Sequence, residues 1–431
     1  MGTFEFDEYK VDHLFLLIGE NPLPNYVAAN LLLNEGGTAY LVYSTDTEKS
    51  AKRLQDILKS ESNSFKDIEL RSLNDYESDA YYIQQQIKEK LGSIKSGKVG
   101  LNYTGGTKAM SAHSYRALFY EEIKDKSNTL YKRRENIIFS YLDPRRLEIC
   151  IDREDNERVR LKIKPDTLQV ELVKLFQLHG LEFKKQPTQN IKLSKLTKEL
   201  VKIFGEDEKK KLWFDWYFQI FCEEARIKKN GTWGNWKSNT DLAKIFVSLN
   251  DLPSSFVEVL KNEKLLNDEG KLALSNVKSI DLFPEIKDLC KWLDGIWLEH
   301  YVLERVKTIA NDQFIQYYGM NFQLKLTSTE KFEFDVAFTR GYQLFAISCT
   351  TISDRKLCKS KLFEAYLRAK QMGGDEARVA LICCFDEPDS LKAEISGTLP
   401  DKKIAVFGRE HLENLATELN TWINQNDVGT K

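Results

Sequence analysis

The chain has 431 residues, of which 30% are charged and 42% are hydrophobic, with 9 prolines. A single hydrophobic core seldom organises so long a chain, so we expect two or three folded domains with disorder only at the ends. The net charge of −2 excludes a globally basic nucleic-acid coat, although lysine clusters such as 209–211 can still attract phosphates locally.

The cysteines and histidines indicate no metal or disulfide framework. The seven cysteines form no CxxC pair, and the five histidines are scattered along the chain. No basic stretch followed by an apolar segment occurs at the N-terminus, and no apolar run reaches 18 residues. We therefore expect a reduced, cytoplasmic protein without a membrane span.

The first part of the chain alternates short apolar runs with helical periodicity. The expected elements are a strand at 13–19, a helix at 26–34, a strand at 39–45, a helix at 48–60 and a strand at 68–73. This order is typical of a parallel sheet covered by helices. We expect a Rossmann-like α/β domain over residues 1–155, ending in a hairpin of NIIFSYLD and RLEICID.

Three loops follow strands of this sheet, where ligands bind in such folds. They are GENPLPN (19–25), STDT (44–47) and LNYTGGTKAMS (101–111). In the third loop, two adjacent glycines allow close backbone approach, while Thr104, Thr107 and Lys108 add hydroxyls and one positive charge. This pattern predicts an anion site, with a plain tight turn as the alternative. It matches neither GxGxxG nor GxxxxGK[ST], which disfavours a dinucleotide-dependent enzyme.

The three loops, within residues 10–150, resemble the CRISPR-associated Rossmann-fold (CARF) domain. The resemblance implies a homodimer that binds cyclic oligoadenylate, a messenger of type III CRISPR systems, with cyclic tetra-adenylate expected before cyclic hexa-adenylate. It assigns the ligand contacts to Asn25, Thr45, Thr47, Asn102, Thr104, Gly105, Gly106, Thr107, Lys108 and Met110. A two-fold dimer would present each donor twice to a two-fold ligand.

Residues 156–285 carry Leu, Phe, Trp and Lys at helical spacing, which predicts a mostly helical insert. The segment LLNDEGKLALS (265–275) favours a small hairpin after the helices, as in a winged-helix-like fold. The aromatic run WFDWYFQIF (213–221) is more typical of a core than of a base-stacking platform. Trp233 and Trp236 lie among turn formers, which indicates an exposed contact or a packing anchor.

Residues 286–431 begin with a helix on which Glu299 lies off the apolar face. Strands are expected at 331–339 and 342–351, a helix at about 356–372, and further strands in RVALICCF and KIAVFG. A helix with an acid, a hairpin with Asp335 and a second helix follow the order of PD-(D/E)xK nucleases. That chemistry uses a divalent cation held by carboxylates and a lysine that orients or deprotonates water.

The segments GIWLEHYV, FEFDVAFTRGYQLFAIS and KLFEAYLRAKQMGGDEARVAL resemble the nuclease domain of CARF-containing PD-(D/E)xK effectors. The resemblance implies that Glu299 and Asp335 bind Mg²⁺ or Mn²⁺. Where that family has Glu-Cys-Lys, this chain has Ser348, Cys349 and Thr350. An acid and a lysine are therefore missing from their usual places.

Three explanations remain open for these replacements. In the first explanation, Lys361 and Glu364, three residues apart on the next helix, take over the missing roles, with Lys356 and Lys359 as alternatives. In the second explanation, the two remaining acids hold the metal alone, and the serine and threonine contact water or phosphate. In the third, the nuclease is dead.

From these patterns we expect a ligand-activated nuclease that cuts single-stranded RNA or DNA. The alternative is a catalytically dead, cyclic-oligoadenylate-responsive regulator that only binds nucleic acid.

Overall fold

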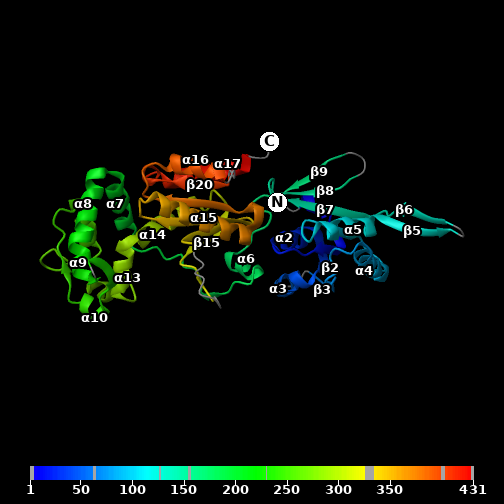
Figure 1. Ribbon diagram of the computed structural model, residues 1–431, viewed down its shortest axis with the longest axis horizontal. Helices are drawn as coiled ribbons and strands as arrows, with labels where there is room; N and C mark the ends of the chain where they lie inside the picture. Colours follow the sequence, from blue (N-terminus) through cyan, green and yellow to red (C-terminus); the bar gives the residue numbers. More distant parts are fainter. Residues whose placement is uncertain are drawn as a thin grey trace.

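The computed structural model describes residues 4–61, 65–125, 128–153, 157–229, 231–325, 334–398 and 403–428. The chain is elongated, and its C-terminal α/β part lies between the N-terminal sheet and the helices of the middle segment (Figure 1). No helix in these ranges is long and apolar enough to cross a membrane.

The N-terminal sheet has seven strands in the order β3-β2-β1-β4-β7-β8-β9. Its strands are β1 (Val11–Leu17), β2 (Leu33–Tyr43), β3 (Asp67–Ser72), β4 (Val99–Asn102), β7 (Ile137–Asp143), β8 (Glu148–Ile151) and β9 (Val159–Lys162). The first five are parallel, and the last two are added as antiparallel neighbours. The Rossmann-like prediction is confirmed, and the sheet continues beyond residue 155.

Helices cover this sheet because their apolar residues recur on one face. The helices are α1 (Phe4–Asp7), α2 (Leu23–Leu32), α3 (Glu48–Ser60), α4 (Ala80–Ser93) and α5 (Lys108–Phe119). In α3, for example, Ala51, Leu54 and Leu58 are buried, whereas Lys52 between them is exposed. A separate hairpin of β5 (Tyr120–Asp125) and β6 (Asn128–Arg133) projects from the end of α5 (Figure 1).

The middle segment consists of short helices and short strands. Its elements are α6 (Leu172–Leu178), β10 (Phe183–Lys185), α7 (Ser194–Gly205), α8 (Asp207–Trp216), a π-helical turn (Tyr217–Phe221), α9 (Cys222–Ala225), β11 (Arg226–Lys229), β12 (Thr232–Trp236), α10 (Asn239–Leu242), β13 (Phe246–Val247), α11 (Ser254–Asn262), β14 (Leu272–Ala273), α12 (Asn276–Ser279) and α13 (Ile286–Lys291). The expected turn is present, since Gly270 N donates to Asn267 O over 3.0 Å.

The C-terminal sheet has the order β15-β17-β18-β19-β20. Its elements are a helix kink (Trp292–Ile296), α14 (Trp297–Ile309), β15 (Ile315–Met320), β16 (Gln323–Leu324, paired with β10), β17 (Val336–Arg340), β18 (Gln343–Thr350), α15 (Arg355–Gly373), β19 (Arg378–Cys383), α16 (Pro388–Thr398), β20 (Ile404–Phe407) and α17 (Leu415–Val428). Side chains alternate between its faces: Val336 and Phe338 share a core with α14 and α17, and Ala337 shares one with α15.

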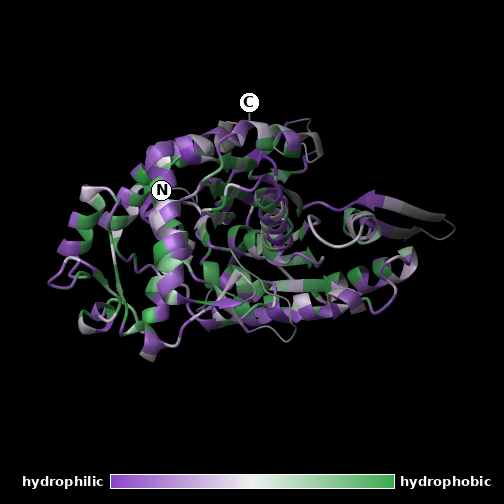
Figure 2. Cartoon of the chain, turned by 60° about the vertical axis from the view of Figure 1, so that its left-hand side comes forward, coloured by the Kyte–Doolittle hydropathy of each residue, from purple (hydrophilic) through white to green (hydrophobic). Residues whose placement is uncertain are grey.

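Two large apolar cores result from this alternation. One joins the N-terminal sheet to the α15 face of the C-terminal sheet, and the other joins the middle helices to the α14 face. Hydrophobic residues accordingly lie along the strands and the inward helix faces, with hydrophilic residues outside (Figure 2). The C-terminal sheet is therefore packed against both other parts of the chain.

A polar junction connects the loop after β1 with the C-terminal part. Asn21 in that loop lies 3.1 Å from His179 Nε2, and a Cβ atom added to Gly374 would lie 2.5 Å from Asn21 Nδ2. Two residues further on, Glu376 is 1% exposed, and no described residue hydrogen-bonds its Oε1. Its backbone oxygen accepts from Gln343 Nε2 at the start of β18.

Burial raises the pKa of Glu376 from 4.5 to about 7, so the folded chain binds this proton more tightly than the unfolded chain. Its contribution to stability is complete below pH 4.5 and is lost as pH rises through 7, and it amounts to about 3 kcal/mol. We expect Glu376→Gln to remove this dependence. Urea unfolding between pH 5 and 8 checks it, and a constant difference between variant and parent would contradict it.

Candidate functional site

In the N-terminal sheet, the loop between β4 and α5 is held by its own polar side chains. Thr107 caps α5, because its Oγ1 accepts from Met110 N at 3.1 Å. Asn102 Oδ1 accepts from Thr104 N at 3.3 Å, and Thr104 Oγ1 accepts from Leu142 N at 2.7 Å. These contacts fix the loop conformation and occupy the side chains that make them.

The glycines of this loop press against the loop after β1. A Cβ atom at Gly105 would lie 2.2 Å from Leu17 O and 3.1 Å from Asn25 Oδ1, so only glycine fits there. Asn25 is fully buried and donates to Leu17 O over 2.8 Å. Gly106 has φ of +73°, a left-handed conformation that favours glycine.

The ten predicted ligand residues differ in burial. Asn25, Asn102 and Met110 are buried and support the loops. Thr45, Thr107 and Lys108 are exposed, and among the described residues no partner engages the Lys108 ammonium. The other four members are half-buried, and Thr47 Oγ1 accepts from Ser44 N. The loop thus presents a cation, hydroxyls and the N-terminal amides of α5 to solvent, a donor set that suits phosphate groups.

In the C-terminal sheet, the hairpin of β17 and β18 brings Asp335 and Ser348 together. Asp335 is 9% exposed, and its Oδ2 accepts from Ser348 Oγ at 3.1 Å and from Cys349 N at 2.5 Å. β17 and β18 are antiparallel, and Val336 pairs with Ile347. Asp335, which precedes Val336, therefore lies opposite Ser348, which follows Ile347. Strand alternation places Thr350 on the same face.

Lys361 on α15 reaches the same hairpin. Its Nζ donates to Cys349 O over 3.2 Å, and its charge opposes the effect of burial, which raises the pKa of Asp335. The charge of Glu364 raises that pKa further, so the carboxylate is also near, although Glu364 is exposed. The structure therefore brings Lys361 and Glu364 to Asp335.

The other candidate lysines lie elsewhere. Lys359 pairs with Glu394 over 2.5 Å, and Lys356 is exposed.

Glu299 also lies near the end of β18 that carries Cys349. It lies on α14, is half-buried, and its charge helps to raise the pKa of the buried Cys349 thiol, of which burial is the main cause. Thr350 Oγ1 accepts from Ile352 N at 3.3 Å. Within the described ranges, no three His, Cys, Asp or Glu residues form a metal-binding cluster. The carboxylates of Glu299 and Asp335 alone suit Mg²⁺, which takes one or two carboxylates and completes its shell with water and phosphate oxygens.

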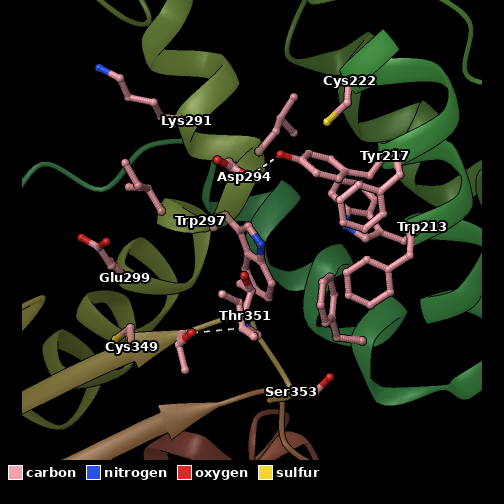
Figure 3. Close-up of a pocket in the computed structure, with 18 of the residues that line it drawn as sticks. Trp213, Tyr217, Cys222, Lys291, Asp294, Trp297, Glu299, Cys349, Thr351 and Ser353 are labelled. Carbon is pink, nitrogen blue, oxygen red and sulfur yellow. Dashed lines mark hydrogen bonds between the residues drawn. The ribbon is translucent and has the colours of Figure 1, made fainter. Parts of the chain in front are cut away.

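A cavity of about 680 Å³ opens in front of this hairpin. Cys349, Thr350, Glu299 and Lys361 contribute to one side of it, and aromatic residues of the middle segment form the other. Figure 3 shows Trp213 and Tyr217 on the helices of the middle segment, Thr351 and Ser353 beyond the end of β18, and Asp294 joined to the Tyr217 hydroxyl. We did not predict this aromatic wall from the sequence, because no local sequence pattern indicates a contact between residues more than one hundred positions apart.

The aromatic run is nevertheless mainly core, as predicted. Trp213, Trp216 and Phe221 are at most 2% exposed, whereas Phe218 is 47% exposed. Trp233 and Trp236 are half-buried packing anchors, with Lys228 Nζ 4.7 Å from the ring centroid of Trp233 and the Arg226 guanidinium 3.8 Å from that of Trp236.

Comparison with known proteins identifies the N-terminal sheet. Residues 14–145 match the family model of the Card1 CARF domain. No curated protein matches the chain in sequence.

Three solved structures are similar to most of the chain. Protein VC1899 from Vibrio cholerae aligns with 96% of this chain and 98% of its own length, at a TM-score of 0.66 and 16% identity. Can2 from Sulfobacillus thermosulfidooxidans, solved in complex with cyclic tetra-adenylate, aligns with 96% of this chain and 99% of its own length, at a TM-score of 0.63 and 16% identity. A type III CRISPR defence DNA nuclease activated by cyclic oligoadenylate aligns with 86% of this chain and 45% of its own length, at a TM-score of 0.50 and 14% identity. These likenesses show a common fold, with a Rossmann-like CARF sheet followed by a C-terminal sheet.

Proposed function

We propose that the protein is a metal-dependent nuclease of type III CRISPR antiviral defence that cyclic oligoadenylate activates. The observation that carries this proposal is the meeting of Asp335 and Lys361 at β18, on a chain whose first sheet has the CARF fold. A lysine on α15 replaces the one absent at Thr350. The C-terminal part is then a variant PD-(D/E)xK domain that cuts single-stranded RNA or DNA in the cytoplasm.

The ligand is cyclic tetra-adenylate, with cyclic hexa-adenylate as the alternative. Lys108, Thr45 and the amides at the start of α5 offer donors for its phosphodiesters, while Gly105 lets the loop pack closely against the end of β1. A homodimer would double this donor set for a two-fold ligand. The buried members of the predicted site hold the loops in place for binding.

At the catalytic hairpin, Glu299 and Asp335 would hold Mg²⁺ or Mn²⁺. When bound, such an ion supplies Lewis acidity and an activated water. Ser348 and Cys349 N orient the Asp335 carboxylate by donating to its Oδ2. Lys361 directs its ammonium to the same strand, where it can donate to an attacking water or to a phosphate oxygen. Thr350, with its hydroxyl on the same face, can contact substrate.

Ligand binding at the N-terminal sheet acts on the catalytic hairpin through the polar junction between the two sheets. The loop after β1 carries Asn21, which contacts Gly374 near Glu376, and it leads into the first turn of α2, where Asn25 is buried. Glu376 O accepts from Gln343, the first residue of the strand that carries Ser348 and Thr350. A ligand that shifts the loop therefore has a route to the hairpin, and differential affinity for the two arrangements drives the change.

The test incubates the full chain with Mn²⁺ and labelled single-stranded RNA, single-stranded DNA and plasmid. Cyclic tetra-adenylate, cyclic hexa-adenylate or neither is added, and parallel samples contain EDTA. We expect cutting only with ligand and metal, and none by Asp335→Asn, which keeps the shape of the side chain without its charge. Ligand binding without cutting of any substrate would instead identify the rival function, a dead nuclease that regulates by binding nucleic acid, which the replacements at Ser348 and Thr350 favour.

A further inference from the structure

The cavity in front of the hairpin is built from two segments that are far apart in the chain. The middle segment contributes Phe214, Tyr217, Phe218 and Trp233, and the C-terminal part contributes the end of β18 with Lys361. Its volume of about 680 Å³ lies in the range of sites that enclose small organic groups. Nothing in the proposed chemistry of Asp335 and Lys361 requires an aromatic wall.

One wall of the cavity contains a π-helical turn, and the other contains a helix kink. The π-helical turn Tyr217–Phe221 interrupts the first helix, whereas non-helical backbone at Gly295 kinks the second within Trp292–Ile296. π-helical turns are rare and frequently lie at functional sites. The Tyr217 hydroxyl donates to Asp294, whose other carboxylate oxygen accepts from Arg226 over 2.5 Å, so the turn and the kink are tied together.

The aromatic wall keeps an accessible ring. Phe218 is 47% exposed although it follows the buried Tyr217, and its ring lies nearly parallel to that of Phe214, with centroids 6.0 Å apart. The wall is therefore ordered by packing on one side and open to a ligand on the other. A flat aromatic ligand gains stacking energy at such a surface.

The charges around the cavity favour an anionic polymer as the partner. Arg226, Lys291 and Lys361 line it together with Asp294 and Glu299, which leaves one positive charge in excess. Among the described residues, Arg226 pairs with Asp294, Lys291 with Asp288, and Lys228, above the Trp233 ring, with Glu223. Lys361 instead donates to the neutral Cys349 O, so it is the cation available to a phosphate. A nucleotide combines the two requirements, since its base is flat and its phosphate is anionic.

We propose that this cavity receives an unpaired base of the single-stranded substrate, stacked on Phe218, next to the phosphodiester that reaches Lys361. This inference rests on the proposed nuclease function and adds its specificity for single strands. A base in a duplex is paired and stacked, so it enters such a cavity only after it leaves the helix. The middle segment is then a substrate-binding wall of the active site.

The test measures fluorescence anisotropy of labelled 12-nucleotide RNA, DNA and duplex with the full Asp335→Asn chain and cyclic tetra-adenylate. We expect Phe218→Ala to weaken binding of both single strands about tenfold, the value of one stacked base. Phe218→Trp should retain binding. Phe246→Ala is the matched control, because Phe246 is 51% exposed on the same segment but does not line the cavity.

Abasic oligonucleotides identify the stacked base. An oligonucleotide that lacks the base at one particular position should bind about tenfold more weakly to the parent chain, which retains Phe218. The same missing base should have no further effect on binding to Phe218→Ala. If the parent binds single strands but Phe218→Ala binds them equally well, this inference fails while the nuclease proposal stands. If neither binds any oligonucleotide and the wild-type chain cuts nothing, both fail. Melting temperatures within a degree or so of the parent, the scale of a small surface effect, would exclude misfolding as the cause.

Discussion

Replacing Lys361 with alanine is expected to lower the rate of ligand-activated cleavage by about 100-fold, the usual contribution of a positioned acid or base. The reason is geometric: the Lys361 ammonium donates to Cys349 O, beside the Asp335 carboxylate, and no lysine occupies position 350. Initial rates with saturating cyclic tetra-adenylate and Mn²⁺ give the measurement. Binding of the ligand should not change, because Lys361 lies on α15 beside the C-terminal sheet, and the predicted ligand residues lie in the N-terminal part.

A second substitution separates a displaced lysine from a structural effect. Thr350 is on the same face of β18 as Ser348, so Thr350→Lys in the Lys361→Ala background should restore part of the rate. Lys359→Ala is the control, since Lys359 lies on the same helix but pairs with Glu394. Normal cutting by Lys361→Ala would show that this lysine has no catalytic role.

Gly105→Ala is expected to abolish activation by the ligand. The added Cβ would lie 2.2 Å from Leu17 O, a backbone atom that cannot move aside without shifting β1. The loop must then withdraw, and losing two hydrogen bonds to phosphate weakens ligand binding by about 100-fold. Isothermal titration with cyclic tetra-adenylate measures this effect directly.

Gly92→Ala is the matched control for this change, because Gly92 lies in α4 and a Cβ there would meet no atom within 4 Å. That variant should bind ligand normally and gain slightly in stability. Lys108→Ala provides a second check that leaves the fold intact, with binding about tenfold weaker through loss of one charged donor. Wild-type affinity in Gly105→Ala would place the ligand site elsewhere.

Local patterns were sufficient to predict the elements that these experiments use. Alternating apolar runs and helices predicted the parallel sheet, because such periodicity reflects which face of each element is buried. Thr107 was expected to supply a hydroxyl to an anion site, and the structure shows that this hydroxyl caps α5. Asp335 was expected on a hairpin with Ser348, and the register of β17 and β18 places the two in hydrogen-bonding contact.

Other features depended on contacts between distant segments. Helical spacing placed Lys361 and Glu364 on the same side of α15, but only packing against β18 turned the lysine inward and left the glutamate exposed. The aromatic run was expected to be core, which holds for Trp213 and Trp216. The π-helical turn shifts Phe218 out of that pattern, and no periodicity foretells such a shift.

The sequence by itself determined the strands, the helices and the chemistry available at each loop end, because these follow from periods of two and 3.6 residues and from side-chain type. The tertiary structure alone decided that Asn21 contacts Gly374, that Lys361 meets Asp335, and that an aromatic wall closes over the hairpin. Those outcomes depend on how whole faces pack. A side chain's distant neighbours are set by the shape of all the elements between them, which no short stretch of sequence contains.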